Sequence, residues 1–166
     1  GDVDAVIHPF TEDYPSDSLV AVEAFVKTGG VFVDFGGMPM FNAYRTDANG
    51  RACPDPKADS ARDRARLRIQ EVAWWMDARY PAGATVRPTD AMDGFCPTGQ
   101  TYAASRFLTP ARLRPGDAFI PLLAAQTNGV DLVAAAVYKF NSDYRGAVVV
   151  NARVEWASGA SDEARQ

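Results

Sequence analysis

An apolar strand, a helix and a second apolar strand follow one another within the first 35 residues. DAVIHPF, residues 4–10, is an apolar run of strand length. PSDSLVAVEAFVKTGG, residues 15–30, places apolar side chains at helical spacing and ends on a glycine pair, which is typical of a helix C-terminus. VFVDF, residues 31–35, follows at once. Because such a unit with short joints crosses over in the right-handed sense, we expect two parallel, neighbouring strands in an open sheet.

The rest of the chain alternates apolar runs with stretches rich in Pro, Gly and Thr. We expect an open α/β sheet, largely parallel, with helices on its faces and a loop-rich insertion at about residues 42–116. The periodicity predicts a helix from Asp59 or Ser60 to about Arg79, a short helix over 118–126, and strands over 133–140 and 147–156. The run DLVAAAVYKF is typical of a strand that is buried on both faces.

The length of the chain fits a single domain over residues 1–166, with a tail at about 157–166 that we expect to be disordered. A doubly wound sheet usually has strand and helix units before a crossover of this kind. We therefore expect the chain to be a piece of a larger protein, in which other polypeptide completes an edge of the sheet.

Charge argues against nucleic acid as a partner, and the length of the apolar runs argues against a membrane. Seventeen Lys and Arg stand against 21 Asp and Glu, so no basic surplus is present to neutralise a nucleic-acid backbone. No apolar run reaches the roughly 18 to 20 residues of a membrane span. We expect a soluble module without nucleic-acid or membrane partners. Secretion or a periplasmic location stays open for a larger parent protein.

The cysteine and histidine content argues against a metal centre. The chain has Cys53, Cys96 and a single His, so a Cys/His zinc site is not expected, and we predict no metal and no other cofactor. Both cysteines precede a proline, which favours extended or turn segments. Two unpaired thiols are the simpler interpretation, and a disulfide in an oxidising compartment is the alternative.

The motifs at both ends of the chain resemble one family. The chain resembles the class I glutamine amidotransferase-like, flavodoxin-like domain that accompanies many glycoside hydrolases, including the trimerisation domain of certain bacterial β-galactosidases. The stretches that carry the resemblance are DAVIHPF, FVKTGG, VFVDFGGMPMF and the later AAAVYKFNSDYRGAVVV. This resemblance implies an open flavodoxin-like sheet. The resemblance covers about half of the chain. It implies a non-catalytic module of a carbohydrate-active enzyme. Such a module would pack against the rest of its own polypeptide or other subunits, form a homo-oligomer, or help to wall a carbohydrate site.

The catalytic requirements of this family are not met by the sequence. A working amidotransferase places a cysteine on a strained turn after a strand, with a His and a carboxylate to activate it. Here Gly36 and Gly37 are followed by Met38, a thioether, so we predict no catalytic residues. The glycines instead favour close backbone packing.

An alternative is a small hydrolase, such as a glycosidase, with its acid and base at the strand ends. Such a site needs paired carboxylates. The candidate catalytic residues are His8, acting with Glu12 or Asp13, and Asp34.

Aromatic residues in the insertion are candidates for a ligand site or an interface. Trp74 and Trp75 are adjacent near the end of the predicted long helix, so they face different sides. One packs inward, and the other meets a loop, a partner chain or a sugar ring; the simpler alternative is that surrounding loops bury both. The predicted binding or interface residues are Gly36, Gly37, Met38, Tyr44, Trp74 and Trp75.

Overall fold

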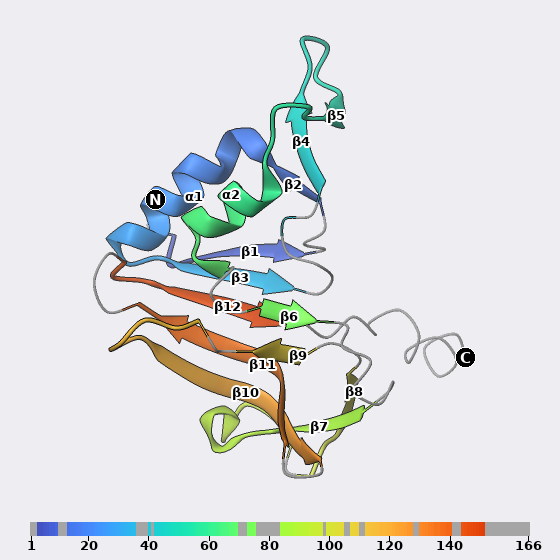
Figure 1. Cartoon of the computed structure of the whole chain (residues 1–166), viewed down its shortest axis with the longest axis vertical. Helices are drawn as coiled ribbons and strands as arrows, with labels where there is room; N and C mark the ends of the chain where they lie inside the picture. Colours follow the sequence, from blue (N-terminus) through green and yellow to red (C-terminus); the bar gives the residue numbers. More distant parts are fainter. Residues whose placement is uncertain are drawn as a thin grey trace.

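The computed structural model describes residues 3–9, 13–35, 40, 42–69, 73–75, 84–97, 99–104, 107–109, 112–127, 130–140 and 144–151. Its main element is an open, curled sheet (Figure 1). The strands, in spatial order, are β1 (Ala5–Pro9), β3 (Val31–Phe35), β12 (Ala147–Asn151), β11 (Val130–Lys139), β10 (Ala118–Thr127), β7 (Ala84–Pro88) and β8 (Tyr102–Ala104). Two further strands extend it: β9 (Phe107–Thr109) pairs with β11, and β6 (Ala73–Trp75) pairs with β9.

The predicted crossover at the start of the chain is confirmed. β1 and β3 are parallel neighbours, with Ala5 opposite Val31 and Pro9 opposite Phe35. Between them, a 3-10 turn, η1 (Ser16–Ser18), leads into α1 (Leu19–Thr28), which covers one face of the sheet (Figure 1). The helix ends as expected at Gly29, whose φ of 127° is in the region that favours glycine.

The sheet is open but mixed, and the prediction of a largely parallel sheet is wrong for the described residues. The parallel part is β1–β3–β12. From β12 onward, the pairs β12–β11, β11–β10, β10–β7 and β7–β8 are all antiparallel. A flavodoxin-like sheet with helices on both faces is not what the described residues form. The core side chains Leu19, Val26 and Leu67 from the helical segments all pack in one cluster with Phe32 and Val148 of the sheet. We call the face that carries Phe32 and Val148 the helix-covered face.

The β10–β11 hairpin joins two hydrophobic cores. Its register is irregular at Pro121–Leu123 and again at Leu123–Ala124. Bulges of this kind change which side chains face each side and increase the local twist. Tyr138 and Val133 therefore lie in the main core, whereas the smaller second core contains Val86, Ala104, Phe107, Leu132 and Ala134. Leu132 to Ala136 are all buried, which confirms the prediction of a strand buried on both faces.

The predicted long helix is wrong in its second half. It begins where expected, because Asp59 Oδ1 accepts hydrogen bonds from the Ala61 and Arg62 amides at 3.0 and 3.1 Å. However, α2 (Ser60–Arg66) stops after seven residues. Arg68 has a positive φ of 56°, and its buried guanidinium is ion-paired with Asp117. This tertiary contact outweighs the helical propensity of the following residues.

Two more segments differ from the prediction. Trp74 and Trp75 belong to strand β6, opposite Leu108 and Phe107 of β9, and not to a helix. Residues 118–126, predicted as a short helix, are part of β10, because β11 and β7 pair with it on both sides.

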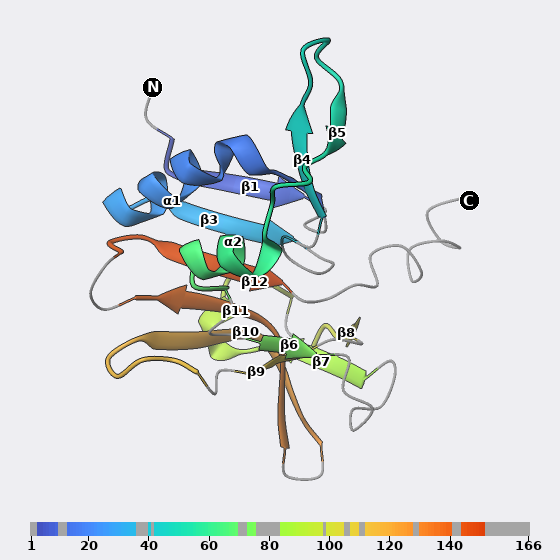
Figure 2. The ribbon, with the colours of Figure 1, turned by 45° about the horizontal axis from the view of Figure 1, so that its top comes forward.

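Where the structure describes it, the predicted loop-rich insertion at 42–116 contains several strands and helical turns. A small second sheet is formed by β2 (Asp13–Pro15), β4 (Asn42–Thr46) and β5 (Ala52–Pro54). Its β4–β5 hairpin projects from the body of the molecule (Figure 2). The insertion also holds α2, β6 to β9 and a second 3-10 turn, η3 (Asp90–Met92).

The two cysteines, Cys53 and Cys96, are both free, so the disulfide alternative is wrong and the unpaired interpretation is confirmed. Among the described residues, no helix has the length and apolar character needed to cross a membrane. The expected disordered tail and the end of the strand predicted over 147–156 lie outside the described residues.

Candidate functional site

The structure brings His8 and Asp34 together at the carboxyl ends of β1 and β3. The two residues are directly opposite in the parallel register, and His8 Nδ1 lies 3.8 Å from Asp34 Oδ1. Strand alternation puts both on the helix-covered face, because Phe32, two residues before Asp34, packs there. Asp34 is only 1% exposed. His8 also lines a small apolar cavity of about 110 Å³, together with residues that include Tyr14, Leu19, Phe32 and Met40.

This pair does not form a complete catalytic constellation within the described residues. A separation of 3.8 Å is longer than a hydrogen bond, so the two groups interact only electrostatically. The two hydroxyls that line the cavity are committed elsewhere: Ser18 Oγ donates to the Pro15 carbonyl at 3.0 Å, and Tyr14 donates to Asp63 at 2.6 Å. A nucleophile that His8 could activate is therefore missing from the described lining.

Several predicted site residues cannot be compared with this geometry. Glu12, Gly36, Gly37 and Met38 lie outside the described residues. Trp74 and Trp75 belong to the main sheet through β6. No group of three or more His, Cys, Asp or Glu side chains that could hold a metal ion is present in the described part of the chain.

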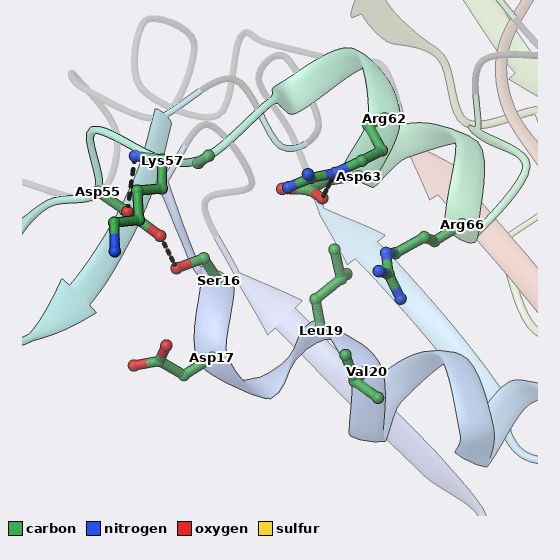
Figure 3. Close-up of a pocket in the computed structure, with 10 residues that line it drawn as sticks. Ser16, Asp17, Leu19, Val20, Asp55, Lys57, Arg62, Asp63 and Arg66 are labelled. Atoms are coloured by element: carbon green, nitrogen blue, oxygen red, sulfur yellow. Dashed lines mark hydrogen bonds and ion pairs between the residues drawn. The ribbon is translucent and has the colours of Figure 1, made fainter.

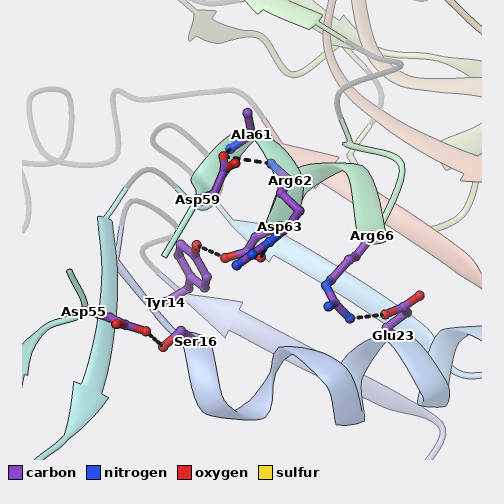
Figure 4. A network of polar contacts seen from close by, with 9 residues as sticks. All are labelled: Tyr14, Ser16, Glu23, Asp55, Asp59, Ala61, Arg62, Asp63 and Arg66. Carbon is purple, nitrogen blue, oxygen red and sulfur yellow. Dashed lines mark hydrogen bonds and ion pairs between the residues drawn. The ribbon is translucent and has the colours of Figure 1, made fainter. Parts of the chain in front are cut away.

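A polar network connects β2, α1 and α2 (Figure 4). The Asp63 carboxylate accepts from the Tyr14 hydroxyl and, at 3.3 Å, from Arg62 Nε. Burial, together with the hydrogen bond to Asp63, raises the pKa of Tyr14 above its usual range.

A second link joins α2 to α1. Arg66 Nη1 donates to Glu23 Oε2 at 2.9 Å, and Lys27 Nζ donates to Glu23 Oε1 at 2.6 Å. The hydrogen bond from Lys27, assisted by that from Arg66, lowers the pKa of Glu23. The network therefore holds the helices in place.

A charged pocket of about 290 Å³ lies between the start of α1 and α2 (Figure 3). It is lined by Ser16, Asp17, Leu19, Val20, Asp55, Lys57, Ala58, Arg62, Asp63 and Arg66. Three basic and three acidic side chains balance one another in this lining. Asp55 accepts from Ser16 Oγ at 2.7 Å and from the Lys57 amide at 2.9 Å, and these hydrogen bonds lower its pKa. The balanced charge gives no preference for an anion or a cation.

A wider, open groove of about 450 Å³ lies on the small sheet. Its lining is Asp13, Tyr14, Pro15, Tyr44, Arg45, Thr46 and Ala52. In the register of β2–β4–β5, Pro15 and Pro54 lie on either side of Tyr44. Strand alternation places Asp13, Tyr44 and Thr46 on the same face.

The groove contains two residues that the sequence singled out and several that it did not. Tyr44 was a predicted binding or interface residue and Asp13 a candidate of the hydrolase alternative, whereas Arg45 and Thr46 were not predicted. Asn42 Nδ2 donates to Asp13 Oδ1 at 2.9 Å across a separation of 29 residues. The alternating stretch NAYRT indicates a strand with two distinct faces, but only the pairing of β4 with β2 brings Asp13 to the same surface. In the groove, Tyr44 is half-buried, whereas Asp13 and Arg45 are exposed.

The fold and these sites define an α/β domain with an open mixed sheet and a projecting three-stranded arm. No family model and no curated protein sequence matches the chain. Among solved structures, the chain is similar to a GH42 beta-galactosidase, at 13% sequence identity and a TM-score of 0.47, over 90% of this chain and 19% of that one. The chain thus spans about a fifth of the length of the galactosidase chain. At this level, the similarity assigns neither a family nor an activity.

Proposed function

We propose that the chain is a non-catalytic, amidotransferase-like module of a carbohydrate-active enzyme, and that the groove on β2, β4 and β5 forms one wall of a sugar site. The observation that carries the proposal is the placement of Tyr44 beside Asp13, Arg45 and Thr46 in one open groove of about 450 Å³. A sugar ring has an apolar C–H face and a rim of hydroxyls. A site for it therefore needs one aromatic surface and a few polar groups around it.

Each groove residue has a role suited to such a ligand. The ring of Tyr44 offers the flat apolar surface, and its strand neighbours Pro15 and Pro54 restrict the surrounding backbone. The hydrogen bond from Asn42 occupies Asp13 Oδ1, which leaves Oδ2 to accept a bond from a sugar hydroxyl. Thr46, on the same face as Tyr44, adds a hydroxyl to the groove.

The available carboxylates support binding over hydrolysis. Glycoside hydrolysis needs two carboxyl groups about 5 to 9.5 Å apart across the scissile bond. The described lining of the groove holds one acidic side chain, Asp13. Asp34 is almost completely buried beneath the helices and cannot contact a polymeric substrate without unfolding around it.

The hydrolase alternative keeps one observation in its favour, the approach of His8 to Asp34 at the strand ends. A cavity of about 110 Å³ is too small for a disaccharide, since ligand pockets are usually about 300 Å³ or larger.

The binding proposal can be tested by NMR titration of the chain with a panel of neutral mono- and oligosaccharides. We expect shifts centred on residues 13–15 and 42–46. Tyr44→Ala should abolish them, and Tyr44→Phe, which keeps the ring, should retain them. Phe95→Ala is the matched control, because Phe95 is an exposed aromatic side chain, at 83%, outside the groove.

Activity assays on chromogenic glycosides and on glutamine complete the test. We expect no turnover by the wild-type chain. Turnover that is lost in His8→Ala or Asp34→Asn would replace the binding proposal with the hydrolase alternative. Saturable sugar binding that survives Tyr44→Ala unchanged would place the sugar elsewhere and contradict the assignment of the groove.

A further inference from the structure

The face of the main sheet opposite α1 carries a continuous row of β-branched side chains across five strands. Each member is directly opposite the next in the strand register. The row, which we call the aliphatic row, consists of Ile7, Val33, Val149, Val137 and Ile120. It combines two parallel and two antiparallel pairings and is not visible in any single segment of the sequence.

Burial shows that this face is open along the aliphatic row, in contrast to the helix-covered face, whereas farther along β11 it is covered, as Ala135 at 4% exposure shows. On β3, Phe32 is 3% exposed, whereas its neighbours Val31 and Val33 are only partly buried. At the two ends of the row, Ile7 is 61% and Ile120 is 38% exposed. Parallel strands normally have both faces covered. The aliphatic row therefore exposes surface of a kind that is usually buried.

The neighbouring positions make the patch almost free of charge. The adjacent row in the same register is Ala5, Val31, Ala147, Lys139 and Ala118. On the other side, Pro9 lies opposite Phe35. Among these described positions, Lys139 is the one charged residue. A charged peptide or a nucleic acid does not complement such a surface, whereas another apolar surface does.

The size of the patch indicates what can cover it. Five strands about 4.8 Å apart and two alternate positions about 6.7 Å apart, together with Pro9 and Phe35, give a projected area of about 390 Å². This is within the range of about 300 to 600 Å² at which the largest apolar patch of a protein is often functional. Two such faces together bury about 780 Å², which is the size of a weak, transient protein interface.

We propose that two copies of this chain associate face to face through the aliphatic row. A row that meets its own copy about a two-fold axis is self-complementary. Two twisted sheets pack at about 10 Å with their strands about 30° apart, so that β-branched side chains of one row enter the gaps of the other. This association uses the main sheet and does not depend on sugar binding in the groove of the small sheet.

The test is sedimentation velocity of the full chain between about 2 and 200 µM, where a weak dimer changes its population by mass action. We expect reversible association to a dimer in the wild type. Ile7→Lys and Ile120→Lys should each raise the dimer dissociation constant by about tenfold or more. Val20→Lys is the matched control, because Val20 is 60% exposed on α1, on the other side of the sheet, and this variant should dimerise like the wild type.

Two features of the design distinguish face-to-face packing from other association. Ile120 lies on β10, in the interior of the strand order, whereas Ile7 lies on the edge strand β1. Weakening by Ile7→Lys alone would indicate pairing through the β1 edge and would overturn the proposal. A wild-type chain that stays monomeric up to about 200 µM would also overturn it. In that case, helices of another polypeptide would be the expected cover of the aliphatic row. Circular dichroism on each variant checks that the fold is kept.

Discussion

The Tyr14 hydroxyl donates a hydrogen bond of 2.6 Å to the carboxylate of Asp63, which is 49 residues away in the sequence. Both side chains are buried, Tyr14 at 2% and Asp63 at 4% exposure. The contact joins β2, and with it the small sheet, to α2. It therefore links the candidate sugar groove to the main body of the domain.

Removing this hydroxyl should destabilise the fold. Tyr14→Phe takes one donor from a buried carboxylate, and we expect a loss of about 1 to 3 kcal/mol in the free energy of unfolding, measured by urea denaturation. Tyr44→Phe is the control, because the structure gives the Tyr44 hydroxyl no hydrogen-bond partner among the described residues and the cost should stay within about 0.5 kcal/mol. Equal stability of the two variants would contradict the role of the Tyr14–Asp63 contact.

The opposite result is expected at Tyr138. Its side chain is 2% exposed, and its hydroxyl has no hydrogen-bond partner in the described part of the chain. Because an unsatisfied buried hydroxyl costs about 1 to 3 kcal/mol, Tyr138→Phe should be neutral or stabilising by about 1 kcal/mol. Thermal melting of this variant and of Tyr14→Phe, run side by side, checks the contrast. A loss of more than about 1 kcal/mol in Tyr138→Phe would show that the hydroxyl has a partner.

Alkaline pH should destabilise the protein through the same two tyrosines. Burial raises the pKa of Tyr138, and burial with the hydrogen bond to Asp63 raises that of Tyr14. A raised pKa in the folded state means that the stabilising contribution is complete below the unfolded pKa of about 10 and is lost as the pH rises above it. The urea midpoint should therefore fall above about pH 10, and fall less in Tyr138→Phe. A midpoint with the same alkaline slope in both proteins would refute this origin.

The Arg68–Asp117 ion pair should be among the most sensitive contacts of the fold. The two side chains are 3% and 2% exposed, and the guanidinium also lies 4.3 Å from the centre of the Phe140 ring. Arg68→Ala removes the buried guanidinium from the buried Asp117 carboxylate, so we expect a loss of about 3 to 5 kcal/mol. Arg62→Ala is the control, because the Arg62 side chain is 58% exposed and its ion pair with Asp63 should contribute less than about 1 kcal/mol. Similar losses in the two variants, measured by urea denaturation, would contradict the prediction.

Two glycines at the turn beside α1 should differ in their tolerance of a methyl group. A Cβ at Gly146 would lie 2.0 Å from the Gly30 carbonyl oxygen, a backbone atom that cannot move away. A Cβ at Gly30 would meet the ring of Phe25 at 2.2 Å, and a side chain can rotate. We expect Gly146→Ala to cost about 2 to 4 kcal/mol and Gly30→Ala less, by thermal melting. Gly50→Ala, at a φ of 78° with no atom within 4 Å, should cost about 1 kcal/mol.

Elements whose signals are local could be predicted from the amino-acid sequence. The crossover of β1, α1 and β3 followed from apolar periodicity and from Gly29, which suits the left-handed end of a helix. Asp59 predicted the start of α2 correctly, because an N-cap side chain bonds to backbone amides of the first turn, only two or three residues away. The sequence also placed His8 and Asp34 at neighbouring strand ends, since parallel strands bring their carboxyl ends to the same edge, but it paired His8 with Glu12 or Asp13 and not with Asp34.

The remaining features could not be predicted from the sequence, because they depend on which distant segments meet in the folded chain. Residues 118–126 have an apolar run compatible with a helix, but β11 and β7 supply partners on both sides and make it strand β10. Arg68 ends the helix early because Asp117, 49 residues later, holds its guanidinium. The groove at Tyr44 and the aliphatic row exist only through register. A sequence records which residues can face one side of a strand, and the register of pairing decides which of them become neighbours.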